Sequence, residues 1–105
     1  MNKNNDPKSG PEIDKLIHEP ARLKIMAQLY VVEEADFIFL MRQTGLTWGN
    51  LSSHMSKLEE AEYIEVRKEF LDKKPHTILK LTLKGRDAFK KYCSALDQVL
   101  KDLPQ

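Results

Sequence analysis

The sequence predicts a single α+β domain, mostly helical, in which a helix-turn-helix is followed by a two-stranded hairpin and a long C-terminal helix. Three observations support this fold class. Residues 44–60 carry a Thr-Gly turn signal and then apolar side chains at helical spacing. Residues 63–82 change to a period of two and are rich in β-branched side chains, as strands are. Residues 83–102 return to helical spacing, and a chain of 105 residues is long enough for one such domain.

Composition excludes several classes of protein. No apolar run approaches the length that crosses a bilayer, and the first residues lack the apolar run of a signal peptide. Cys93 stands alone, which excludes an internal disulfide and a cysteine-based metal cluster and indicates a reducing, cytoplasmic location. His18, His54 and His76 lack ligand spacing, so we expect no metal site and no cofactor. No catalytic constellation can be assembled, and we expect that the protein is not an enzyme.

The chain up to about Val31 is expected to contain an N-terminal tail, a short helical turn and the first helix of the domain. Residues 1–11 are polar, contain Pro and Gly, and are expected to form a disordered tail ahead of a domain at residues 12–82. A short helical turn is expected at residues 12–17. Pro20 then suits the first position of a helix that runs to about Val31, because the missing N–H of proline costs nothing there. The apolar side chains of this helix form two stripes, which predicts burial on two sides.

The middle of the chain predicts two helices joined by a tight turn. After a loop, a very short strand is expected at residues 36–37, and a short apolar helix at residues 37–42. Gly45 marks a turn, and Thr47 is a good N-cap for a second helix that ends near Ala61. Helix, turn and helix in this order predict a helix-turn-helix, in which the second helix is the recognition helix.

The two sides of the recognition helix differ in an unusual way. Leu51, Met55 and Leu58 form its apolar stripe. Its other side carries side chains that are nearly all short and uncharged, namely Gly49, Asn50, Ser53, Ser56 and Lys57. A helix face that is merely solvated is usually rich in Glu and Lys, because long side chains keep their freedom in a helix. Small hydrogen-bonding side chains suit a helix that lies in a groove of DNA, since they approach base edges closely.

The predicted hairpin is basic. Strands are expected at residues 63–70 and 76–82, joined by a charged turn at residues 71–75. The net charge of the whole chain is only +1, but residues 67–86 hold seven basic residues against two acidic ones. A hairpin with a basic tip directly after a helix-turn-helix is typical of a wing, which reaches phosphates or the minor groove of DNA. The alternative is a solvated hairpin whose lysines only keep an exposed edge soluble.

The last segment, residues 83–105, is expected to be a dimerisation helix capped by Thr82. Its apolar side chains are spaced three and four residues apart, as in a coiled-coil seam. This seam, the predicted dimer interface, consists of Phe89, Tyr92, Leu96, Val99 and Leu103. A twofold dimer matches a palindromic DNA site, which favours pairing. The alternative is a helix that folds back on its own domain.

The candidate DNA-binding residues lie on the recognition helix and the wing. They are Thr47, Trp48, Gly49, Asn50, Ser53, His54, Ser56, Lys57, Lys68, Lys73, Lys74 and His76. Asn50 and Ser53 are the leading base-edge contacts, and Thr47 with the first amides of the helix is expected to bind phosphate. The alternative for each polar residue is ordinary exposure. Trp48 suits the edge of the core equally well, and for His54 a packed, hydrogen-bonded structural role is favoured.

These motifs together resemble the small winged-helix transcriptional regulators related to the MarR and ArsR types. The blocks occur in order as Thr44-Gly45-Leu46-Thr47-x-Gly49-Asn50-Leu51-Ser52-x-His54-x-x-x-Leu58-Glu59, Lys68-x-Phe70, Pro75-x-Thr77 and Leu81-Thr82-x-x-Gly85-Arg86-x-Ala88-Phe89. The resemblance implies a homodimeric, sequence-specific DNA-binding protein, usually a repressor. One departure is Glu62, which stands where the family commonly has a left-handed Gly. Either Glu62 tolerates that strain, or the helix ends by another route.

The sequence therefore predicts a DNA-binding transcriptional regulator, most simply a repressor. It would act as a homodimer on a pseudo-palindromic operator, with helix 47–61 in the major groove and wing 70–77 on the flanking backbone or minor groove. Two other functions fit the pattern. One is a winged helix used for protein–protein contact without specific DNA binding. The other is a regulator with a small-molecule effector at the dimer interface, although nothing in the sequence identifies an effector.

Overall fold

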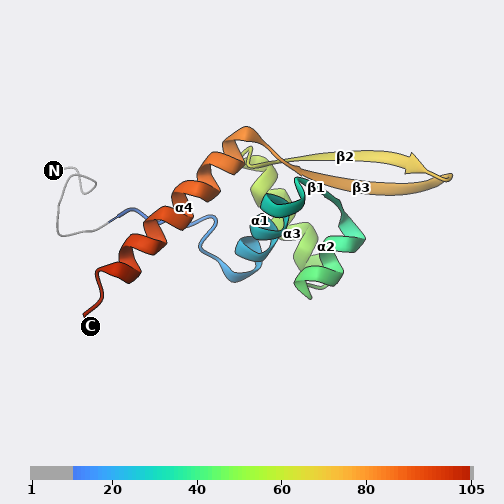
Figure 1. The fold of residues 1–105 in the computed structure, drawn as a ribbon. Coiled ribbons are helices and arrows are strands. Elements are labelled where there is room, and N and C mark those ends of the chain that lie inside the picture. Colours follow the sequence, from blue (N-terminus) through green and yellow to red (C-terminus); the bar gives the residue numbers. More distant parts are fainter. Residues whose placement is uncertain (1–10, 105) are drawn as a thin grey trace.

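The computed structural model describes residues 11–104 of the chain. Nearly all of the predicted N-terminal tail therefore lies outside the described residues. The elements, in order, are α1 (Pro20–Val32), β1 (Glu34–Asp36), α2 (Phe37–Thr44), α3 (Trp48–Glu60), β2 (Ile64–Leu71), β3 (Lys74–Leu81) and α4 (Leu83–Lys101). Helices form the body of the molecule, and the β2–β3 hairpin projects from it (Figure 1). The predicted mostly helical α+β fold, with a helix-turn-helix, a wing and a long last helix, is confirmed.

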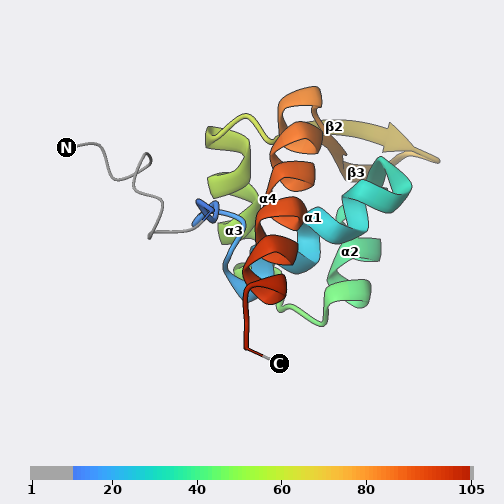
Figure 2. The same ribbon diagram turned by 60° about the vertical axis from the view of Figure 1, so that its left-hand side comes forward.

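Helix α1 lies at the centre of the core. Figure 2 shows it between α3 and α2, with α4 packed across it. Ile25, Met26 and Leu29 are fully buried, while Leu23 and Tyr30 are partly buried against the same core. Burial on two sides, as the two apolar stripes predict, is confirmed. The fully buried side chains are Ile17, Ile25, Met26, Leu29, Leu40, Leu51, Leu58, Ile64 and Leu79, and each contributes about 1.5–3 kcal/mol of hydrophobic stabilisation.

The four helices begin at side chains that accept a hydrogen bond from the first turn. Glu19 accepts from the amide of Arg22 at 2.8 Å, and this bond outweighs desolvation to hold the pKa of Glu19 below its ordinary value. Asp36 caps α2, Thr47 caps α3 and Thr82 caps α4 in the same way. These caps satisfy amides that have no partner inside their helix, so they fix where each helix starts.

The sheet has three antiparallel strands in the order β1-β3-β2. The strand at Glu34–Asp36 is longer than the predicted one, and it pairs with β3 from Asp36 opposite Ile78 to Glu34 opposite Lys80. The sheet is therefore one strand larger than the two-stranded wing predicted from the sequence.

The turn of the hairpin is shorter than predicted. The sequence indicated a turn at residues 71–75, but only Asp72 and Lys73 form it, with φ angles of 52° and 64°. Two left-handed residues make a turn whose twist matches that of the strands, so no longer loop is needed. Pro75 consequently lies in β3, opposite Phe70. In such a hairpin the second pair from the turn exchanges no hydrogen bonds, so the absent N–H of proline is tolerated there.

Helix α3 ends in a left-handed residue, as the family resemblance suggested. Glu62 has a φ of 64°. Its amide donates to the carbonyl of Glu59 at 2.9 Å, and the amide of Tyr63 donates to the carbonyl of Leu58 at 3.0 Å. This is the paired hydrogen bonding of a Schellman motif, normally built on Gly. Of the two alternatives for Glu62, the structure shows the first: the residue tolerates the strain.

Helix α4 runs across the domain and is held at its start by a close backbone approach. A Cβ atom on Gly85 would lie only 2.0 Å from the carbonyl oxygen of Tyr63, so only glycine fits. Further along, Phe89 and Tyr92 are buried, with Phe89 against Tyr30 of α1. These two residues of the predicted dimer seam belong to the core of their own domain, which corrects the expectation. The reason is that the first half of α4 covers α1 and so has no free apolar face.

Candidate nucleic-acid interface

Within the described residues, the outer face of α3 is open. From Thr47 to Lys57 its exposed residues are Thr47, Trp48, Gly49, Asn50, Ser53, Ser56 and Lys57, and the acidic Glu59 and Glu60 are exposed at the end of the helix. Leu51 and Leu58, on the opposite side, are fully buried, and Met55 is partly buried. The short polar side chains therefore point away from the protein. An open row of small hydrogen-bonding groups has the shape that contact with base edges requires.

Local hydrogen bonds decide which of these groups remain available. The Thr47 hydroxyl accepts from the amide of Asn50 at 3.2 Å and so caps the helix. The Ser56 hydroxyl donates back to the carbonyl of Ser52 at 3.2 Å. The side chains of Asn50 and Ser53 make no hydrogen bond within the described residues. They are therefore the groups best placed to meet a partner, and Ser56 contributes less than the sequence suggested.

His54 holds α3 to the start of α1. Its Nδ1 lies 3.0 Å from Nη1 of Arg22 and 3.8 Å from Oε1 of Glu19. A guanidinium only donates hydrogen bonds, so the Nδ1 atom of His54 is the acceptor of this one. Arg22 is itself fixed, because its Nε donates to the carbonyl of Leu16 at 2.5 Å. This arrangement favours the structural role that the sequence indicated for His54. The residue positions the recognition helix rather than offering a free ring to DNA.

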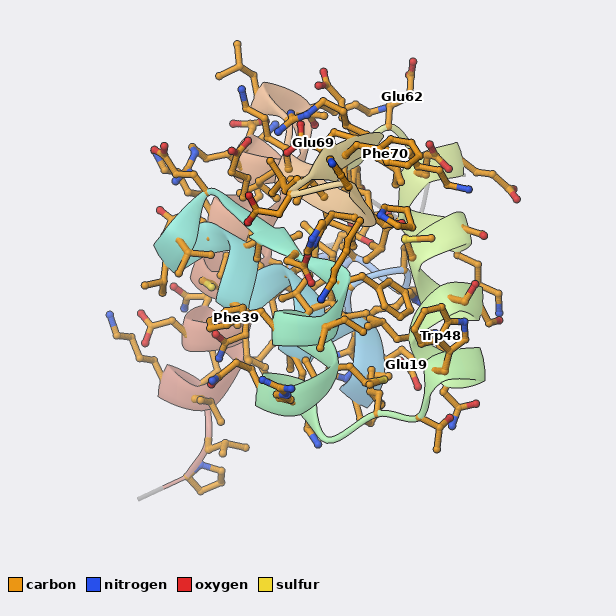
Figure 3. The ribbon with its side chains drawn as sticks, turned by 90° about the vertical axis from the view of Figure 1, so that its right-hand side faces the viewer. Glu19, Phe39, Trp48, Glu62, Glu69 and Phe70 are labelled. Carbon is orange, nitrogen blue, oxygen red and sulfur yellow. The ribbon has the colours of Figure 1, made fainter. Side chains whose placement is uncertain are left out.

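A small groove of about 180 Å³ separates the start of α3 from the wing. It is lined by Asp36, Phe37, Ile38, Trp48, Lys74, Pro75, His76 and Thr77. Trp48 is 61% exposed and rests on Phe37, with 4.6 Å between the ring centroids. One side of its ring therefore meets the edge of the core while the other is open (Figure 3). The sequence suggested either a core-edge position or a surface contact for Trp48. The structure is compatible with both, because one side of the ring packs on Phe37 and the other is exposed.

Most of the free positive charge of the hairpin lies in its outer half; the exception is Lys80, which is exposed near the base and forms no ion pair within residues 11–104. Three of the seven basic residues between positions 67 and 86 are in ion pairs: Arg67 with Glu34 and Glu69, Lys84 with Glu62, and Arg86 with Glu33. Lys68, Lys73 and Lys74 are exposed and form no ion pair within residues 11–104. The local excess of charge counted in the sequence is thus reduced at the base of the wing and retained towards its tip.

His76 ties the wing to α2. Its Nδ1 lies 2.6 Å from Oδ2 of Asp36, the residue that also caps α2 by accepting from the amide of Ile38. Burial raises the pKa of Asp36, but the hydrogen bonds from His76 and Ile38 outweigh it and leave that pKa below its ordinary value. Since its Nδ1 atom is engaged, His76 positions the hairpin relative to the helix-turn-helix. The phosphate contact predicted for it is limited to the opposite edge of the ring.

Sequence reasoning missed Arg22 and Glu19, which fix His54, and Phe70, which is 75% exposed on the wing. No local pattern points to the first two, because they meet α3 only in the folded chain. A signal for Phe70 was present: it follows Lys68 at the period of two that places both side chains on one face of the strand.

Among residues 11–104, no group of three His, Cys, Asp or Glu side chains is arranged to hold a metal ion. No helix in the same range has both the length and the apolar character needed to cross a bilayer.

Known proteins were compared with the chain and its fold. The sequence profile of the winged helix DNA-binding domain family matches residues 21–100. An uncharacterised protein of Methanocaldococcus jannaschii is 39% identical over 89 residues, which cover 85% of this chain and 97% of that protein. Among solved structures, a transcriptional regulator homologue from Pyrococcus horikoshii OT3 superimposes with a TM-score of 0.80 and 32% identity. That match covers 86% of this chain and 91% of the other.

More distant structures share the fold. AbfR of Staphylococcus epidermidis, solved in an overoxidised form bound to DNA, has a TM-score of 0.72 and 17% identity, covering 84% of this chain and 66% of that one. A MarR-like transcriptional regulator from Thermotoga maritima has a TM-score of 0.59 and 14% identity, covering 92% and 72%. The resemblance to winged-helix regulators that the sequence motifs indicated is confirmed by the profile match and by these folds. The chain belongs to the winged helix DNA-binding domain family, and its fold is that of MarR-related regulators.

Proposed function

We propose that this protein is a sequence-specific transcriptional regulator that binds double-stranded DNA as a homodimer. The observation that carries the proposal is the open row of Gly49, Asn50 and Ser53 on α3, beside a wing whose outer lysines are unpaired within the described chain. A surface that combines short hydrogen-bonding groups with nearby free cations fits a duplex, because base edges and phosphates lie side by side in it. The solved complex of AbfR with DNA supports the same use of this fold.

Each part of the surface has a distinct task in this proposal. Asn50 and Ser53 contact base edges in the major groove, and Lys57 reaches a guanine or a phosphate one turn later. The first amides of α3 bind a phosphate at the positive end of the helix. Lys68, Lys73 and Lys74 neutralise phosphates that flank the major-groove contact, in the cytoplasmic compartment that holds the DNA.

Dimer formation is proposed for the C-terminal half of α4. Val99, Leu100 and Leu103 are 36%, 58% and 54% exposed, and Leu96 is only partly buried. This end of the helix extends beyond the helical body, where a second copy could reach it (Figure 1). A twofold pair would present two α3 helices to half-sites about one helical turn apart. A dimer seated on an operator represses by occupying it, and for this reason we favour repression over activation.

The first experiment selects binding sites for the full chain from random duplexes. We expect a pseudo-palindromic site. On that site Asn50→Ala relaxes base preference at one position per half-site at a cost of about 1–3 kcal/mol. Lys73→Ala, the contrasting variant, weakens all sequences about equally and lowers the salt slope by about one. If Asn50→Ala leaves the selected site unchanged, then α3 is not the element that determines base preference.

The salt dependence of binding separates this function from the main alternative. Several phosphate contacts predict that the logarithm of affinity falls steeply with the logarithm of salt concentration. No selected site and a flat response would instead favour a winged helix that contacts another protein. The presence of an effector stays a prediction, since no feature of the fold favours one.

A further inference from the structure

The β2–β3 hairpin has two faces of different character. Cross-strand partners share a face, so Val66 and Leu79, which belong to the core side, are followed outward on the same face by Lys68 and Thr77. The next pair on that face is Phe70 with Pro75, just before the turn. The face that covers the core near the body therefore ends, at the tip, in an apolar pair.

Phe70 is mostly unpacked within the described residues. Its ring is 75% exposed, more than any other aromatic side chain among residues 11–104. It lies on the side of the hairpin along which α3 runs, whereas Glu69 lies on the other side (Figure 3). Pro75 stands opposite Phe70 and limits its freedom. A large aromatic side chain held in the open at the end of a projecting hairpin indicates contact with a partner.

The charges around Phe70 favour a polyanion as that partner, because three lysines stand near it against Asp72, the one acidic residue of the tip that forms no ion pair within the described residues. Lys68 precedes it on the same face, and Lys73 and Lys74 follow at the turn. All three are exposed and form no ion pair within the described residues. When α3 lies in a major groove, the hairpin face on its side turns towards the adjoining backbone and minor groove. Apolar side chains that enter a minor groove contact sugars and base edges there and can wedge between base steps.

We propose that Phe70, backed by Pro75, is an apolar minor-groove contact of the wing, with Lys68 and Lys73 holding the phosphates on either side. This inference rests on the proposed DNA-binding function. It adds a residue whose contact depends on the width and flexibility of the minor groove and not on hydrogen bonds to the bases. The contact makes the sequence flanking each half-site matter, because minor-groove shape depends on sequence.

The test compares Phe70→Ala with Leu71→Ala in the full chain. Leu71 is also exposed and apolar, but it lies one residue further, on the opposite face of the hairpin, and so is the matched control. On the selected duplex we expect Phe70→Ala to weaken binding about five- to tenfold, because the variant loses apolar contact surface. The salt slope should be unchanged, because no charged group is removed. Leu71→Ala should stay within about twofold, and Phe70→Leu should recover most of the loss.

A second measurement tests the groove. Replacing guanine by hypoxanthine in the flanks removes the amino group in the minor groove and leaves the major-groove acceptors in place. We expect the wild type to bind such a duplex at least about twofold tighter and Phe70→Ala to show no change, since only an inserted ring senses that group.

Equal loss in Phe70→Ala and Leu71→Ala, or no loss in either, would overturn the proposal, as would a gain on the hypoxanthine duplex that survives in Phe70→Ala. If the wild type itself binds no duplex with a salt dependence, then the proposed function has failed, and Phe70 marks a contact with a protein. Both variants replace exposed side chains, so unchanged melting temperatures are the check that each is folded.

Discussion

Gly49 offers a test that separates what the fold needs from what a partner needs. It occupies the second position of α3, its φ is not in the left-handed region, and a Cβ atom added to it would meet nothing within 4 Å. The fold therefore gives no reason for glycine at this position. In a helix, glycine even costs about 0.5–1 kcal/mol relative to alanine because it loses more conformational freedom on folding. Gly49 is then either merely a weak point of the helix or, as we propose, a site of close approach, where a side chain would keep α3 from approaching the duplex in the proposed DNA complex.

Gly49→Ala should change the stability of the fold and its affinity for DNA in opposite directions. Gly49→Ala should raise the free energy of unfolding by about 0.5–1 kcal/mol, which for a domain of this size raises the melting temperature by about 2–8 °C. Binding to the selected duplex should weaken at least about fivefold, because a displaced helix strains the neighbouring contact of Asn50, worth about 1–3 kcal/mol. The same variant would thus be more stable and a poorer binder.

The assay combines thermal unfolding with titration of a labelled duplex. Ser94→Ala is the matched control, since Ser94 is exposed in the middle of α4, where alanine also improves helix propensity. It should raise stability and leave affinity unchanged. A Gly49→Ala variant that is more stable and binds as well as the wild type would refute the close approach of α3 at this position. A destabilised variant would contradict the open space beside Gly49.

Three further predictions concern the supports of the interface. Glu62→Gly should stabilise the fold by about 1 kcal/mol in thermal unfolding, because glycine removes the left-handed strain. Glu62→Ala keeps that strain and should stay within about 0.5 kcal/mol of the wild type. Equal melting temperatures for the wild type and both variants would contradict this prediction. Gly85→Ala should cost at least about 2 kcal/mol, because its methyl group meets the Tyr63 carbonyl, and a wild-type melting temperature would exclude that contact. Burial and the hydrogen bond to Asp14 raise the pKa of Tyr63 to about 12 from the 10.0 of an ordinary tyrosine. The folded state therefore keeps its proton when the unfolded state has lost it, so stability should fall as the pH rises from 10 towards 12. In denaturant titrations at several pH values Tyr63→Phe should show a smaller fall, the remainder coming from Tyr92, whose pKa burial also raises; an undiminished fall in that variant would assign it elsewhere.

Local patterns were sufficient to predict most of the fold. The caps at Thr47 and Thr82, the turn at Gly45 and the change of period after Ala61 each depend on neighbours in sequence, and the structure has them where they were predicted. The predicted length of the hairpin turn was wrong, because Asp72 and Lys73 adopt left-handed backbone angles that their residue types only weakly indicate.

Contacts between distant segments explain what the sequence could not predict. A very short strand was expected at residues 36–37, but its bounds at Glu34–Asp36 and its pairing depend on β3, more than forty residues later. Phe89 and Tyr92 share the spacing of a dimer seam and of a core stripe, and periodicity alone does not distinguish the two. The same holds for charge: Glu69, the closer partner of Arg67, is a neighbour in sequence, but the second pairing, with Glu34, crosses the sheet, and counting lysines and arginines could not reveal it.

The tight hairpin gives the wing a fixed reach. Each of its strands has eight residues, and with a rise of about 3.3 Å per residue the hairpin is about 26 Å long. A turn of only two residues has no slack through which that length can vary, and the bond between His76 and Asp36 ties the outer half of the hairpin to the start of α2. On a duplex with about 3.4 Å between base pairs, lengthening each strand by two residues moves the tip by about two base pairs. In the proposed DNA complex, the number of residues per strand would therefore set how far from each half-site the outermost contact falls.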